Sequence, residues 1–186
     1  MCKSVNSHSR VMWITRTAVL VALLVALQWA TAGTQAFAGQ YITGSLVNCV
    51  LAVAALFSGL WSGVVVALLS PFCAFLLGIG PAMIQIVPCI AVGNLLYVLV
   101  LWALAGRKGT AIWLLFAAVL AAAAAKFVSL YVAVVKIVIP MLGEALKAPQ
   151  VQKFTAMFSW PQLVTALIGG MLAMLVLPLL KKAIRK

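Results

Sequence analysis

A small set of neutral polar side chains and one lysine interrupts the apolar stretches of this chain. Amide side chains in an apolar environment need hydrogen-bond partners, and a site built of amides and aromatic faces suits a neutral or zwitterionic organic ligand. Most of these residues lie near what we predict to be the outer ends of apolar helices. The candidate substrate-binding residues are Gln35, Gln40, Tyr41, Asn48, Gln85, Asn94 and Lys126.

Among these residues, Lys126 has the most specific predicted role. It lies about sixteen residues, or roughly 24 Å, into the fifth apolar stretch, which places it in the outer half of a bilayer. An ionisable group at that depth indicates a functional site, here a partner for a ligand carboxylate or phosphate. The alternative is that its long side chain extends to the outer interface. For Asn48 and Asn94, the alternative is a purely structural hydrogen bond to a neighbouring helix.

The other reactive groups are too few for most kinds of catalysis. The chain has no Asp, its one acid is Glu144 in a predicted outer loop, and its one histidine is His8 in the N-terminal leader. This set cannot supply a catalytic carboxylate pair, a metal site or an intramembrane proton relay, and no phosphate-binding loop is present. We therefore predict no enzyme activity, no cofactor and no bound metal. If the protein transports against a gradient, we expect a partner to supply the energy.

The composition requires a membrane. Of 186 residues, 67% are hydrophobic and 8% are charged, far from the balance of a soluble domain. The net charge of +12 would indicate nucleic acid as the partner of a soluble protein. Here the basic residues lie at the ends of apolar stretches, as expected beside a bilayer, so we predict no nucleic-acid partner. The four cysteines are widely spaced and indicate no disulfide framework or metal site.

Six apolar stretches predict an all-α integral membrane protein with about six transmembrane helices. We expect a single membrane domain over residues 1–186, with a cytoplasmic leader at 1–10 and a basic cytoplasmic tail at 181–186. Residues 31–43 and 141–159 are polar and are predicted to connect spans, and Pro71 is predicted to kink the third span. The expected spans are residues 11–30, 44–58, 64–77, 84–105, 110–135 and 160–180.

The basic residues also set the orientation. With both termini in the cytoplasm, nine of the thirteen Lys and Arg lie on the inner side, as the positive-inside rule requires. The basic leader, apolar run and small residues at 30–33 resemble a cleaved signal peptide. We favour an uncleaved first span, because its length approaches that of a bilayer and more membrane helices follow.

The first span carries a stripe of small residues. Ala18, Ala22 and Ala26 recur at every fourth position and therefore lie along one face of a helix. In lipid, helices associate through close backbone approach over small residues rather than through apolar contact alone. The stripe is thus a candidate docking surface.

Taken together, these features resemble the substrate-binding S components of energy-coupling factor (ECF) vitamin transporters. The resemblance rests on six spans, a basic N-terminus, the alanine stripe, and the pair of spans with Gly59, Gly63, Pro71 and the break at residues 78–81. It implies a bacterial plasma-membrane subunit that binds a vitamin or similar micronutrient beneath its outer loops. It also implies docking through Ala18, Ala22 and Ala26 onto a T subunit driven by two ATPase subunits. The alternatives are a stand-alone secondary transporter or channel and a structural membrane protein.

Overall fold

The structure is a computed structural model that describes residues 3–32, 37–78, 83–106 and 111–184. Every regular element within these ranges is a helix, so the predicted all-α fold is confirmed. The elements are α1 (Lys3–Thr31), α2 (Phe37–Val53), η2 (Ala54–Ser58), α3 (Leu60–Leu76), α4 (Ile86–Ala105), α5 (Ile112–Leu130), η3 (Tyr131–Val138), α6 (Ile139–Leu142), η4 (Gly143–Ala145), α7 (Ala148–Met157) and α8 (Trp160–Ile184). The π-helical segments η2 and η3 continue α2 and α5.

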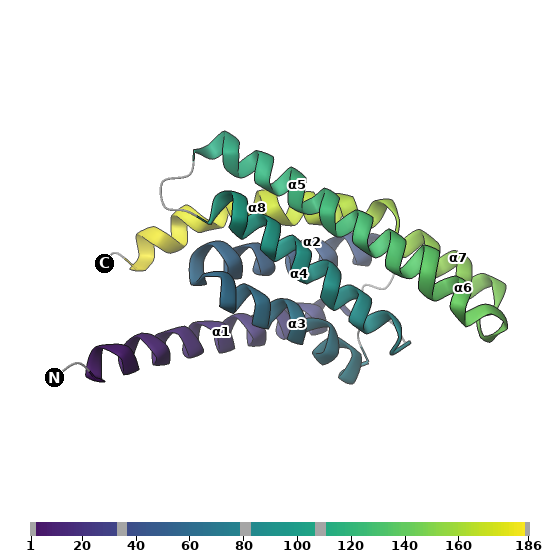
Figure 1. The fold of residues 1–186 in the computed structure, drawn as a ribbon, viewed down its shortest axis with the longest axis horizontal. Helices are drawn as coiled ribbons and strands as arrows, with labels where there is room; N and C mark the ends of the chain where they lie inside the picture. The colour runs from purple at the N-terminus through teal and green to yellow at the C-terminus, as the bar shows by residue number, and fades with distance from the viewer. Residues whose placement is uncertain (1–2, 33–36, 79–82, 107–110, 185–186) are drawn as a thin grey trace.

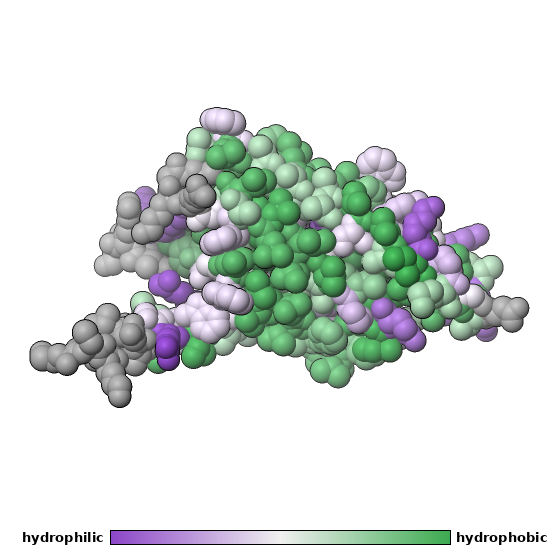
Figure 2. Space-filling model, in the orientation of Figure 1, coloured by the Kyte–Doolittle hydropathy of each residue, from purple (hydrophilic) through white to green (hydrophobic). Residues whose placement is uncertain are grey.

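Helix length and composition fit a bilayer. Within the described ranges, five helical runs are long and apolar enough to cross a membrane, and the shorter apolar helix α3 makes a sixth. Figure 2 shows the apolar surface around the middle of the bundle, with hydrophilic side chains toward its two ends. The chain is therefore a multi-pass membrane protein. The five long runs are Ser9–Thr31, Gly39–Ser58, Ile86–Ala105, Ile112–Leu142 and Ala148–Ala183.

The six helices form a closed ring. Each contacts two neighbours in the order α1, α3, α4, α5, α8, α2, and α2 also contacts α3 and α4 across the ring. The N- and C-terminal ends lie at the same end of the bundle, while α6 and α7 lie at the other end (Figure 1). Termini at one end agree with an even number of crossings.

Glycines allow the closest approaches in this ring. A Cβ added at Gly169 of α8 would lie 2.5 Å from the backbone oxygen of Ser45 on α2. A Cβ at Gly63 would lie 2.7 Å from a methyl of Val98 and 3.1 Å from the Ala55 backbone. Close backbone contact is the main source of helix attraction in lipid, so these glycines stabilise the bundle. Gly59 has a different role: its φ of 98° forms the turn between η2 and α3.

Replacing Gly169 with Val is expected to push α2 and α8 apart. The new Cβ meets backbone atoms, which cannot rotate away, so we expect a loss of about 3 kcal/mol in stability. The thermal unfolding midpoint of the purified protein measures this. Met171→Val, at an exposed position of the same helix, is the control. Equal midpoints for the two variants would contradict close packing of α8 on α2.

Two of the predicted connections are shorter than expected. Residues 31–43 are not one polar loop, because α1 continues to Thr31 and α2 already begins at Phe37. Gln40 and Tyr41 are therefore helical. The glutamine is satisfied within the bundle, where its Nε2 donates to the backbone oxygen of Met157 over 2.9 Å. The third helix also begins earlier than predicted, at Leu60, and continues as an α-helix through Pro71.

The polar segment 141–159 is largely helical. Its helix α7 buries Phe154, and the adjoining Phe158 is also buried; both pack in a cluster with Ile86, Leu130 and Val134. This apolar cluster explains why a segment of low hydropathy folds back onto the bundle. The fifth helical run is longer than predicted, because η3 and α6 extend it to Leu142.

Candidate functional site

A cavity of about 420 Å³ lies between the helices. All six helices of the ring and α7 contribute to its wall. Because Thr31 ends α1 and Gln40 lies near the start of α2, the cavity extends toward the end of the bundle opposite both termini. The polar residues in its wall are Gln28, Thr31, Gln40, Thr43, Asn48, Ser70, Asn94, Lys126, Lys153, Gln162 and Thr165.

Lys126 provides the only deeply buried charge in the described part of the chain. The residue is 3% exposed, and its Nζ donates to Oδ1 of Asn48 over 2.6 Å and to Oδ1 of Asn94 over 2.7 Å. The ammonium also lies 5.7 Å from the centre of the Tyr97 ring, within cation–π range. Three helices thus meet at one nitrogen atom: α2, α4 and α5.

The packing of α5 explains how the lysine reaches the interior. Ala122 and Ala123, in the turn before it, are fully buried and leave space for neighbouring helices. On α4, Gly93 lets Leu130 approach so closely that an added Cβ would be 2.8 Å from the leucine Cγ. The Lys126 side chain therefore lies inside the ring, and its amine is buried against Asn48 and Asn94.

Both asparagines are oriented by bonds from their amide nitrogens. Asn48 Nδ2 donates to the Gly44 backbone oxygen over 2.8 Å and to Thr165 Oγ1 over 3.5 Å. Asn94 Nδ2 donates to Ser70 Oγ over 3.4 Å. These contacts turn the two carbonyl oxygens toward the ammonium. The network links α2, α3, α4, α5 and α8, and both asparagines are only 1% exposed.

Among the side chains that the structure describes, no carboxylate pairs with Lys126. The single acid, Glu144, lies in η4, beyond the end of the helical run Ile112–Leu142. Sixteen residues separate Lys126 from Leu142, which is about 24 Å along a helix. Among the residues that the structure describes, the hydrogen-bond acceptors of the Lys126 Nζ are neutral amide oxygens.

The helix α7 covers the cavity at the end of the bundle opposite the termini. Gln40 of α2 and Gln162 of α8 both donate to the backbone oxygen of Met157, the last residue of α7, over 2.9 and 3.2 Å. Lys153 of α7 also lines the cavity and is exposed. In Figure 1, α7 lies at the end of the bundle away from both termini.

Comparison with known proteins now supplies the family. The family described as "ECF transporter, substrate-specific component" matches residues 13–181, which is nearly the whole chain. The chain belongs to this family. The resemblance drawn from the sequence is thereby confirmed. No curated protein and no solved structure matches the chain.

The S component brings together four of the seven residues that we predicted to bind substrate: Gln40, Asn48, Asn94 and Lys126 all line the cavity. Tyr41 does not, because it follows Gln40 by one position and lies about 100° around the helix. Gln85 does not either, because it is exposed at the start of α4, about 13 Å along the helix from Asn94. Gln35 lies outside the described residues.

Sequence reasoning missed several residues of the cavity wall. Two of them are Ser70, which accepts a bond from Asn94, and Thr165, which accepts one from Asn48. The third is Lys153, which is exposed in the wall. A lone Ser or Thr in an apolar helix usually bonds to its own backbone, so it gives little signal. The available signal is Gly169, which marks the close contact of α8 with α2 one turn from Thr165.

The alanine stripe of the S component faces outward. Ala18, Ala22 and Ala26 are all exposed, whereas Thr17 and Leu24 on the opposite face of α1 are buried. Only 11% of the apolar window in α1 is buried, compared with 33–44% for the other four spanning runs. The helix α1 is therefore the least enclosed member of the ring.

Proposed function

We propose that this S component binds a vitamin or a related small organic micronutrient in the cavity between its helices. The observation that carries the proposal is the cavity itself. Its volume of about 420 Å³ suits a small organic molecule, and convergent polar groups line it inside an otherwise apolar bundle. Gln40, Asn48, Asn94 and Lys126 are the proposed ligand contacts.

Delivery into the cell requires an outside source of energy. The chain contains no phosphate-binding loop and no intramembrane acid that would relay protons. We therefore propose that a T subunit and two ATPase subunits of an ECF transporter supply the energy, in a bacterial plasma membrane with both termini in the cytoplasm. The exposed stripe of Ala18, Ala22 and Ala26 supports docking of T onto α1.

A panel of water-soluble vitamins and their precursors tests ligand binding directly. A compound present at a hundred times its dissociation constant stabilises the folded state by about 2.7 kcal/mol. We expect one class of compound in the panel to raise the thermal unfolding midpoint of the purified S component by about 5 °C. A structural membrane protein without a ligand would respond to none.

A pair of matched variants tests whether the cavity is the site. Val47→Phe places a ring in the cavity wall and should abolish the ligand-induced stabilisation. Val92→Phe makes the same change at an exposed position of α4 and should leave it intact. If the ligand stabilised both variants equally, the binding site would lie outside this cavity.

A further inference from the structure

We infer that the ligand of this S component carries a carboxylate, and that Lys126 binds it at the deep end of the cavity. The inference rests on the proposed function, because it assigns a chemical class to the ligand of that same cavity. It begins from charge. A buried ammonium among neutral groups is costly in a membrane interior, and no carboxylate among the described side chains contacts it.

The hydrogen bonds of the network leave two donors available to a ligand beside Lys126. An ammonium has three protons, and Asn48 and Asn94 accept two. The third has no acceptor among the residues that the structure describes. The Nδ2 of Asn94 donates one of its two protons to Ser70, and Lys126, Asn94 and Ser70 all line the cavity. An acceptor group of the ligand, such as a carboxylate oxygen, would satisfy both of these donors.

The number of cations favours a carboxylate over a phosphate ester. A phosphate carries up to two charges and three acceptor oxygens, and it is usually bound by several cationic or backbone donors. Here one ammonium lies at the deep end with neutral amides around it. The other lysine in the cavity wall, Lys153, is on α7 and exposed. One charge at the deep end matches one carboxylate.

The first test uses the unaltered protein and pairs of compounds that differ only in charge. We would measure dissociation constants for nicotinate against nicotinamide, biotin against biotin amide, and pantothenate against pantothenol. A deproteinised cell extract, equilibrated with the S component and analysed by mass spectrometry, covers compounds outside these pairs. Each captured acid is then compared with its amide.

The expected result is an acid that binds at least about 100-fold more tightly than its neutral partner, as expected for a buried charged contact. A neutral compound that binds as tightly as its acid would overturn the carboxylate while leaving the proposed function in place. Capture of a phosphate ester in preference to every carboxylic acid would overturn it in favour of phosphate. No binding from the pairs or the extract would overturn the proposed function itself.

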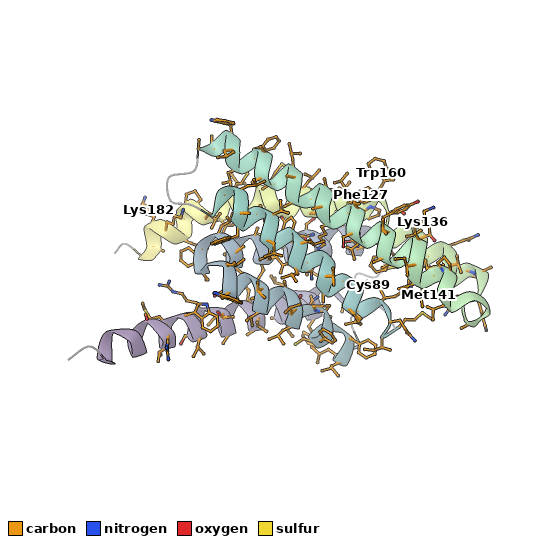
Figure 3. The ribbon with its side chains drawn as sticks, viewed as in Figure 1. Cys89, Phe127, Lys136, Met141, Trp160 and Lys182 are labelled. Atoms are coloured by element: carbon orange, nitrogen blue, oxygen red, sulfur yellow. The ribbon has the colours of Figure 1, made fainter. Side chains whose placement is uncertain are left out.

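The second test changes the charge in the protein. Lys126→Met keeps the apolar stem and removes the ammonium, so it should weaken binding of the acid about 100-fold and leave its amide nearly unaffected. Lys136→Met, an exposed lysine ten residues further along the same helical run, is the matched control and should change neither constant (Figure 3).

Asn94→Asp is a second variant that tests the same assignment if Lys126→Met does not fold. It supplies an internal carboxylate next to Lys126, so the unliganded protein should unfold at a higher temperature and bind the acid at least about tenfold more weakly. Undiminished binding of the acid by either folded variant would overturn the assignment of Lys126.

Discussion

Ala22→Trp is expected to abolish both uptake and assembly with the T subunit, while the ligand affinity of the isolated S component stays nearly unchanged. Ala22 is the central residue of the exposed stripe on α1. An indole at this position would hold a partner helix several ångströms away, and helix association in lipid depends on close backbone approach. The residue does not line the cavity, so the ligand site should be unaffected.

Co-purification with the T and ATPase subunits, uptake of the labelled ligand by cells, and ligand binding by the isolated subunit measure the three effects. Ala121→Trp is the matched control, because Ala121 is an exposed alanine of α5, a helix that does not neighbour α1 in the ring. Loss of ligand binding with an intact complex would show that the stripe serves the pocket. Uptake that continues without any ATPase would favour a stand-alone transporter.

Asn94→Leu is expected to lower the stability of the S component by about 1.5 to 3 kcal/mol, because it removes a charge-assisted hydrogen bond from a buried ammonium. For a chain of this length, that corresponds to a fall of about 5 °C in the thermal unfolding midpoint. The cost arises from Lys126, whose charge would then be held by Asn48 alone.

A double-variant cycle separates this structural role from ligand binding. If the loss in Asn94→Leu comes from the ammonium, then adding Lys126→Met should raise the unfolding midpoint above that of the single Asn94→Leu variant. The ligand should not raise the unfolding midpoint of the double variant. Strictly additive losses of stability would show that Asn94 and Lys126 do not depend on each other.

Much of the fold follows from local sequence. Continuous apolar stretches predict the spanning helices, because every backbone group of a helix is satisfied internally and apolar side chains need no partner in lipid. The failures occur where side chains find partners from distant segments. Their polarity predicts loops over residues 37–43 and over α7, yet Gln40 bonds to α7 and Phe154 packs against α4 and α5.

The candidate site was predictable only in part. Lys126, Asn48 and Asn94 are visible in the sequence, since polar side chains within apolar helices are rare and each needs a partner. Their convergence is not visible. Lys126 is separated from Asn48 by 78 positions and from Asn94 by 32, and only the packing of α2 and α4 against α5 and α8 brings the three together. Tyr41 and Gln85 are equally polar but lie on other faces.

The sequence by itself determined that this chain spans a membrane and carries a lysine at a depth where charge is costly. Those properties depend on residue type and on position along one helix, and both can be read locally. The tertiary structure alone decided which atoms that lysine meets, which helices enclose the cavity and that the alanine stripe remains exposed. These depend on how six helices rotate and pack against one another, which is set by contacts such as Gly169 against Ser45 between segments far apart in the chain.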